Sequence, residues 1–203
     1  MDTVRLGRTG LVVSKNGFGA LPIQRISDEA ACHLLRKAYE GGINYFDTAR
    51  FYTDSEHKIG LALADVRDRI IISSKTMATT VEGFWADLKI SLSMMRTDYV
   101  DLYQFHNPAF CPKPGDGSGL YEAMLEAKEK GMIRFIGMTN HRLAVAEELT
   151  PGAPLVLDDA LVRFDDGRLA AALEILREEA AEKQVLLFTC QSREQEIMKE
   201  KNL

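Results

Sequence analysis

The 203-residue chain is 46% hydrophobic and 27% charged, which is the makeup of one globular domain. Its formal net charge is -5, and Lys and Arg are interspersed with acidic residues. This excludes the basic footprint of a nucleic-acid-binding protein and the basic block that binds an anionic membrane. No signal peptide and no run of roughly 18 apolar residues is present, so the sequence predicts a cytoplasmic protein without a membrane partner.

The cysteines indicate neither a disulfide framework nor a metal site. Cys32, Cys111 and Cys190 are odd in number and scattered, and none belongs to a C-x-x-C pair. We expect reduced thiols and no metal.

The chain opens with a predicted hairpin, whose turn lies at Gly7 to Gly10 and whose second strand holds Val12 and Val13. A short run then ends in GFGALP, and Ser27 begins a helix that ends at Gly41-Gly42. The apolar side of this helix is expected to hold Ala31, Leu34, Leu35 and Ala38.

Short apolar runs then alternate with amphipathic helices, which is typical of βαβ units and a parallel sheet. Helices are expected at 55–66, 82–96, 120–131, 142–149 and 167–184. Strands are expected at about 43–48, 70–75, 99–105, 134–138, 154–158 and 184–189, all in one mainly parallel sheet. The length is short of the roughly 250 residues of a closed eight-stranded β/α barrel.

Four ionisable side chains fall at the carboxyl ends of neighbouring predicted strands. Asp47 and Tyr52 follow the second strand, Lys75 closes the third, and His106 closes the fourth. Reactive groups of parallel β/α folds gather at this end of the sheet, so we expect the four residues to meet at one mouth. Singly, Asp47 and Tyr52 also fit surface or capping groups, and His106 fits a core histidine.

This set of residues is suited to proton transfer. A tyrosine hydroxyl has a pKa of about 10, and a nearby ammonium lowers it. Lys75 would supply that charge, Asp47 would orient Lys75, and His106 would polarise a substrate carbonyl. Reduction of a carbonyl also needs hydride, which must come from a nicotinamide or flavin cofactor because no side chain supplies it. The G-x-G-x-x-G fingerprint of a Rossmann fold is absent.

The segments GINYFDTARFY, IIISSKT, DLYQFHNP and KEKGMIRFIGMTNH together resemble the aldo-keto reductase family, from about Val4 to His141. The resemblance implies an α/β fold, an incomplete (β/α) TIM-type barrel with mainly parallel strands, and NADPH- or NADH-dependent reduction of aldehydes or ketones. Tyr52 would be the general acid, tuned by Asp47 and Lys75, and His106 would place the carbonyl. Cofactor-binding positions implied by the family are Gly19, Ala20, Leu21, Thr139 and Asn140.

The segment after His141 departs from that family, and we assign residues 1–141 and 142–203 to separate parts. Residues 142–197 resemble the C-terminal part of an ATPase head of the structural-maintenance-of-chromosomes-like type, with Asp158 and Asp159 at the Walker B positions. No G-x-x-x-x-G-K-[ST] loop is present, and Gln191 stands where such ATPases have a histidine. The alternatives are therefore an active reductase, a catalytically impaired chimeric or truncated reductase, and an accessory protein of an ATPase.

Overall fold

The computed structural model describes residues 1–140, 155–158, 165–181, 185–188 and 196–199. The chain begins with an antiparallel hairpin of β1 (Thr3–Arg5) and β2 (Val12–Ser14), in which Val4 pairs with Val13. The predicted hairpin is thus confirmed, and its turn contains Gly7 and Gly10 at positive φ.

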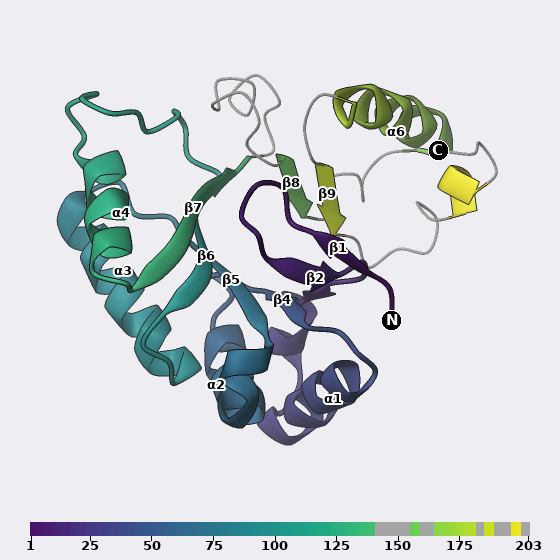
Figure 1. Cartoon of the computed structure of the whole chain (residues 1–203), viewed down its shortest axis with the longest axis horizontal. Helices are drawn as coiled ribbons and strands as arrows, with labels where there is room; N and C mark the ends of the chain where they lie inside the picture. Colours follow the sequence, from purple (N-terminus) through teal and green to yellow (C-terminus); the bar gives the residue numbers. More distant parts are fainter. Residues whose placement is uncertain (141–154, 159–164, 182–184, 189–195, 200–203) are drawn as a thin grey trace.

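A parallel sheet of five strands follows, in the order β3-β4-β5-β6-β7. Its strands are β3 (Phe18–Gly19), β4 (Tyr45–Asp47), β5 (Ile71–Thr76), β6 (Val100–His106) and β7 (Ile133–Thr139). The order follows the chain, as a singly wound β/α succession requires. The described strands form a curved sheet that does not close into a barrel (Figure 1).

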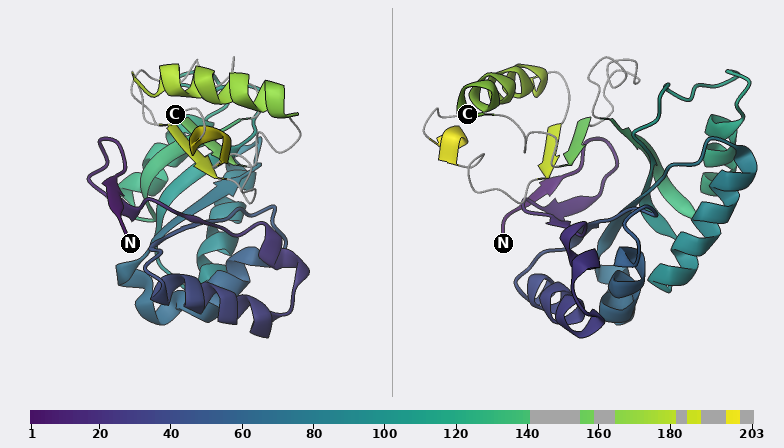
Figure 2. Two further views of the ribbon diagram at one scale, coloured as in Figure 1. Left: turned by 90° about the vertical axis from the view of Figure 1, so that its right-hand side faces the viewer. Right: turned by 180° about the vertical axis from the view of Figure 1, so that it is seen from behind.

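Four helices cover the convex face of this sheet (Figures 1 and 2). They are α1 (Asp28–Glu40), α2 (Ser55–Leu63), α3 (Val81–Met95) and α4 (Leu120–Glu129). The hydroxyls of Ser27 and Thr80 cap α1 and α3 by accepting hydrogen bonds from the backbone N–H groups of Ala30 and Gly83. A short 3-10 helix, η1 (Pro22–Arg25), precedes α1.

Three details of the predicted helices were wrong, one being that the helix expected over 167–184 ends at Glu179. The α-helix expected over 55–66 ends at Leu63 and continues as the 3-10 helix η2 (Ala64–Arg69), where Arg67 donates 3.0 Å hydrogen bonds to the carbonyls of Ile70 and Tyr99. In α1, Ala31 and Leu35 are buried, but Leu34 is 45% exposed. The stripe of α1 that meets the sheet is therefore narrower than the sequence suggested, with Leu34 on its flank.

Alternate strand residues point to opposite faces of the sheet. One face packs against the helices through Phe46, Ile72 and Tyr103, all nearly inaccessible. On the other face Gln104 donates a 2.7 Å hydrogen bond to the Ser73 hydroxyl. At the amino ends of the strands, a second apolar cluster joins the hairpin to the sheet through Leu6, Leu11, Val13, Tyr45 and Ile71.

The C-terminal elements form a sheet of their own, contrary to the prediction of one continuous sheet. Strands β8 (Leu155–Asp158) and β9 (Val185–Phe188) pair in parallel and flank α6 (Asp166–Glu179). No ladder joins them to β7 in the described part of the chain, although β8 contacts β7. Strands joined by a single helix commonly pair with each other directly. The helix expected at 142–149 lies outside the described residues.

Candidate active site

Asp47 and Lys75 form a buried ion pair at the carboxyl ends of β4 and β5. Lys75 Nζ lies 2.5 Å from Asp47 Oδ2, and both side chains are fully buried. Lys75 Nζ also donates a 2.9 Å hydrogen bond to the Thr48 carbonyl. This second bond matters because a buried ion pair offsets its lost hydration only when its remaining donors are also satisfied.

Tyr52 and His106 complete the group. Lys75 Nζ lies 5.2 Å from the centre of the Tyr52 ring, and the Tyr52 and His106 rings meet edge to face with centroids 5.6 Å apart. Tyr52 is 7% exposed and His106 is partly buried. The four residues singled out from the sequence are thus adjacent in the structure, at the mouth formed by β4, β5 and β6.

The β4–α2 loop places Tyr52 through several short-range bonds. Its N–H donates to the Ala49 carbonyl at 3.0 Å, and its carbonyl accepts from the Ser55 N–H at 2.8 Å. The Ser55 hydroxyl is bonded at 2.9 Å to both Thr48 Oγ1 and the Ala20 carbonyl. No role was predicted for Thr48 and Ser55 from the sequence. The available signal was that a small hydroxyl residue follows both Asp47 and Tyr52 within three positions.

A second ion pair, missed from the sequence, lies next to this loop and has a buried carboxylate. Arg50 Nη1 pairs with Glu56 Oε2, and the Glu56 side chain is 1% exposed. Burial raises the pKa of Glu56, while the hydroxyls of Ser74 and Ser91 and the charge of Arg50 partly oppose the rise. The signal available in the sequence was a glutamate in the first turn of a helix, which is usually read as a dipole partner rather than a buried group.

Thr139 and Asn140 lie next to this mouth, at the end of β7, and each is 6% exposed. The Thr139 carbonyl accepts from the Asn107 N–H at 2.7 Å, and Asn140 Nδ2 donates to the Pro108 carbonyl at 2.7 Å. Both bonds tie β7 to the loop that follows His106. The pair therefore adjoins His106, and its contact with a cofactor stays a prediction.

The loop after β3 contributes the other expected cofactor positions. A Cβ built on Gly19 would meet no atom within 4 Å, so this position is open. Ala20 is fully buried, and its N–H donates to the Asp47 carbonyl at 2.8 Å while its carbonyl accepts from Ser55. Leu21 precedes η1. Ala20 thus joins this loop to the site, and direct cofactor contact by these residues stays a prediction.

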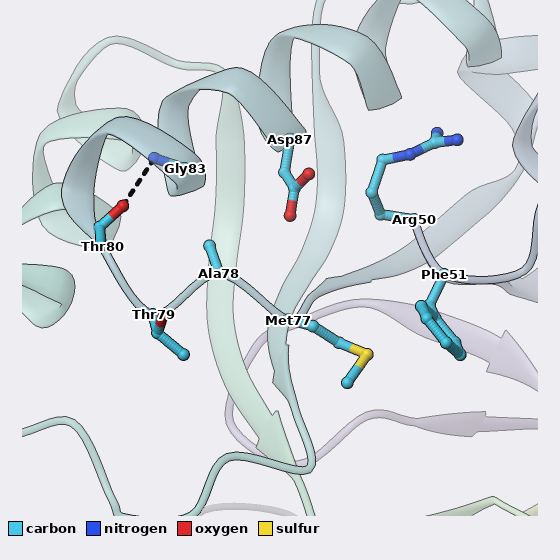
Figure 3. A pocket seen from close by; sticks show the side chains of 8 residues that line it. All are labelled: Arg50, Phe51, Met77, Ala78, Thr79, Thr80, Gly83 and Asp87. Carbon is cyan, nitrogen blue, oxygen red and sulfur yellow. Dashed lines mark hydrogen bonds between the residues drawn. The ribbon is translucent and has the colours of Figure 1, made fainter.

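A pocket of about 390 Å³ opens where the loops following Asp47 and Lys75 meet the start of α3. Figure 3 shows its lining, which consists of Arg50 and Phe51, residues 77–80, and Gly83 and Asp87. Phe51 is 70% exposed and Met77 is 49% exposed. This pocket, whose lining includes the residue before Tyr52 and the second residue after Lys75, is therefore partly apolar and open to solvent.

The acidic residues proposed as an ATPase site are only partly described. Asp158 is the last residue of β8, and Asp159 and Gln191 lie outside the described residues. Among the described residues, no group of three or more His, Cys, Asp or Glu side chains is arranged to hold a metal ion.

The order of the strands, which follows the chain, is that of a β/α-barrel protein. The profile of the Aldo/keto reductase family matches residues 15–164. The chain belongs to the aldo/keto reductase family. The match extends beyond His141, into the part that the sequence analysis assigned to an ATPase fragment, and the comparisons give that assignment no support.

Individual relatives agree with the family. The chain is 31% identical over 166 residues to the uncharacterized oxidoreductase YqkF of Bacillus subtilis (strain 168), covering 75% of this chain and 53% of that protein. It is 34% identical over 132 residues to methylglyoxal reductase DkgB of Salmonella typhi, covering 61% of this chain and 48% of that protein. The chain therefore spans about half the length of these relatives.

Solved structures share the fold. The holo form of an aldo-keto reductase from Bacillus halodurans superposes with a TM-score of 0.71 and 26% identity, over 92% of this chain and 65% of that one. This agreement confirms the α/β fold predicted from the sequence, of which the described residues form an unclosed barrel. No helix in the described ranges combines the length and apolarity needed to cross a membrane.

Proposed function

We propose that this protein reduces aldehydes or ketones with hydride from NADPH or NADH, and that Tyr52 donates the proton to the carbonyl oxygen. The observation that carries the proposal is the approach of Asp47, Lys75, Tyr52 and His106 at one mouth, joined by distances of 2.5 Å, 5.2 Å and 5.6 Å. Three neighbouring strands supply Asp47, Lys75 and His106, so the sheet holds their relative positions, and the β4–α2 loop supplies Tyr52.

Each residue has a distinct part in the proposed step. Lys75 stabilises negative charge on the Tyr52 oxygen as the proton leaves, because its ammonium lies close to that ring. Asp47 holds Lys75 in place through the buried ion pair. His106, edge to face with Tyr52, donates a hydrogen bond to the substrate oxygen and aligns the carbonyl with the phenol.

The described residues fit a nicotinamide cofactor at the mouth. Thr139 and Asn140 carry a hydroxyl and an amide, groups that can exchange hydrogen bonds with a carboxamide, and Gly19, at the end of β3, leaves open space for a ligand. When bound, the cofactor supplies the hydride that the side chains cannot. We assign Asn140 and Thr139 to the nicotinamide end and Gly19, Ala20 and Leu21 to the bordering loop.

The name of one relative indicates a class of substrate to test first. Methylglyoxal reductase acts on a small dicarbonyl compound, and it is 34% identical to this chain over the matched residues. A small aldehyde also suits the partly apolar rim made by Phe51 and Met77. We therefore propose small aldehydes and ketones as substrates, and the cytoplasmic location stays a prediction.

The test is the rate of NADPH and NADH oxidation with methylglyoxal, for the wild type and for Tyr52→Phe. Proton donation of this kind contributes roughly 10²- to 10⁴-fold, so Tyr52→Phe should lose activity on that scale. Tyr121→Phe, which makes the same chemical change at the start of α4, is the matched control and should keep the wild-type rate. Equal rates for wild type and Tyr52→Phe would exclude Tyr52 as the acid.

The two alternatives from the sequence gain no support from the comparisons. Neither a catalytically impaired remnant nor an accessory protein of an ATPase is indicated by the family match or by the relatives reported above. A measured reductase activity that depends on Tyr52 would exclude the impaired reductase directly.

A further inference from the structure

We propose that Arg50 and Glu56 act together as a positioning pair for Tyr52, an inference that rests on the proposed function. Neither residue belongs to the tetrad or to the expected cofactor positions, and Arg50 also lines the neighbouring pocket. Both lie within four residues of Tyr52, and together they contact the loop that carries Tyr52 and the strand that carries Lys75.

Arg50 holds the loop on both sides of Tyr52. Its backbone N–H donates a 2.9 Å hydrogen bond to the Lys75 carbonyl, which joins the loop to β5. Its guanidinium reaches forward, and Nη2 donates to the Thr53 carbonyl at 3.2 Å. Arg50 therefore fixes the loop before Tyr52 through its backbone N–H and after Tyr52 through its guanidinium.

Thr53 needs such support. Its φ is 44°, in the left-handed region that a β-branched residue rarely adopts. A backbone in this conformation persists only when surrounding contacts hold it, and the bond from Arg50 to the Thr53 carbonyl is one of them. If this bond is lost, the turn after Tyr52 is free to relax, and the ring shifts relative to Lys75 and His106.

Glu56 anchors the guanidinium and connects it to the sheet. Oε2 accepts from Arg50, and Oε1 accepts a 2.6 Å hydrogen bond from the Ser74 hydroxyl. Ser74 directly precedes Lys75 on β5, and neighbouring strand residues face opposite sides. Strand β5 thus presents Lys75 to Asp47 on one face and Ser74 to Glu56 on the other. The Arg50–Glu56 pair therefore contacts both the strand that carries Lys75 and the loop that carries Tyr52.

A buried ion pair with no part in catalysis provides the comparison. Arg67 and Asp101 pair at 2.7 Å with side chains 10% and 1% exposed, and Asp101 lies near the amino end of β6, away from His106 at its carboxyl end. The carboxylate is 1% exposed in both pairs, but the Arg67–Asp101 pair touches neither the Tyr52 loop nor the end of β5 that carries Lys75.

The test compares the double variants Arg50→Met/Glu56→Gln and Arg67→Met/Asp101→Asn. Removing both charges of each pair avoids leaving one buried charge without its partner. The first readout is the ultraviolet titration of tyrosine, recorded for each background with and without Tyr52→Phe, because this difference isolates Tyr52 from the other tyrosines of the chain. This readout requires no enzyme activity.

In the Arg50→Met/Glu56→Gln background, we expect Tyr52 to titrate at higher pH than in the wild type, because its ring moves away from the Lys75 ammonium. If the chain reduces methylglyoxal, kcat should also fall roughly 10- to 100-fold with little change in KM. The Arg67→Met/Asp101→Asn control should lower thermal stability and leave both the Tyr52 titration and kcat unchanged.

An unchanged Tyr52 titration in the folded Arg50→Met/Glu56→Gln variant would overturn the positioning role. A shifted titration in a chain whose wild type reduces no carbonyl compound would support the positioning role and reject the proposed function. If the double variant does not fold, Arg50→Lys decides the question. Its single ammonium keeps the charge beside Glu56 but cannot span Glu56 and the Thr53 carbonyl as the guanidinium does, so the same titration shift is expected.

Discussion

Lys75 Nζ and Asp47 Oδ2 lie 2.5 Å apart on neighbouring parallel strands, and neither side chain reaches solvent. The strand register explains the pairing. Asp47 stands beside Ser73, so Lys75 emerges two residues further along β5, on the same face and nearer the mouth. Its long side chain reaches back to the carboxylate and to the Thr48 carbonyl. The register of β4 and β5 thus fixes the Asp47–Lys75 ion pair.

Lys75→Met should lower the free energy of unfolding by about 3–5 kcal/mol, because it leaves the Asp47 carboxylate buried without its partner. Urea unfolding followed by circular dichroism measures this. Lys75→Met/Asp47→Leu should recover much of the loss, since both charges are then removed. Equal stability of the single and double variants would contradict the predicted coupling.

Stability should depend on pH through Glu56. Burial raises its pKa above the ordinary value of 4.5, so the folded state keeps this proton to higher pH than the unfolded state does. The resulting stabilisation is complete below the unfolded value and is lost as pH rises through the folded one. The unfolding free energy of wild type minus that of Glu56→Gln should therefore decrease as the pH rises above 4.5.

Urea midpoints at several pH values would measure the effect, with Glu82→Gln as the matched substitution at an exposed site of α3. A wild-type to Glu56→Gln difference that stays constant with pH would show that burial does not shift the titration of Glu56.

Gly60→Ala should destabilise the protein by roughly 1–3 kcal/mol, as overpacking does. The added Cβ would lie 2.2 Å from the Met94 carbonyl oxygen, where α2 meets α3. Gly167→Ala in α6 is the control, because its Cβ would have its nearest contact at 3.4 Å, and it should be neutral or stabilising by up to about 1 kcal/mol. Thermal unfolding of both variants decides the point, and a Gly60→Ala protein as stable as the wild type would show that the two helices can separate at no cost.

Asn140→Ala should weaken NADPH and NADH binding by about 10-fold, the scale of one lost hydrogen bond together with a loosened loop. The amide joins β7 to the Pro108 carbonyl and adjoins the proposed nicotinamide position. Calorimetric titration measures the affinity, with Asn16→Ala on the exposed hairpin side as the control. Unchanged affinity for Asn140→Ala would remove Asn140 from the proposed cofactor site.

The sequence by itself determined the local elements and the chemistry at their ends. Strands at 45–47, 71–76, 100–106 and 133–139 coincide with Ile-, Phe- and Val-containing runs, and their ends carry Asp47, Lys75 and His106. The reason is that strand periodicity, helix caps and turn glycines act within a few residues. Because the strands are parallel, their carboxyl ends then lie at the same edge of the sheet.

Only the tertiary structure decided the contacts between distant segments. Ser55 is bonded to the Ala20 carbonyl 35 positions away, and Glu56 accepts from Ser74 18 positions away. Among the described strands, the pairing of β8 with β9, rather than with β7, is a choice of the same kind. Each depends on which groups come within hydrogen-bond distance once the helices pack on the sheet, and local propensity does not specify that. Packing then turns Arg50 and Glu56, which the sequence presents as ordinary surface charges, into an ion pair beside Tyr52 whose carboxylate is buried.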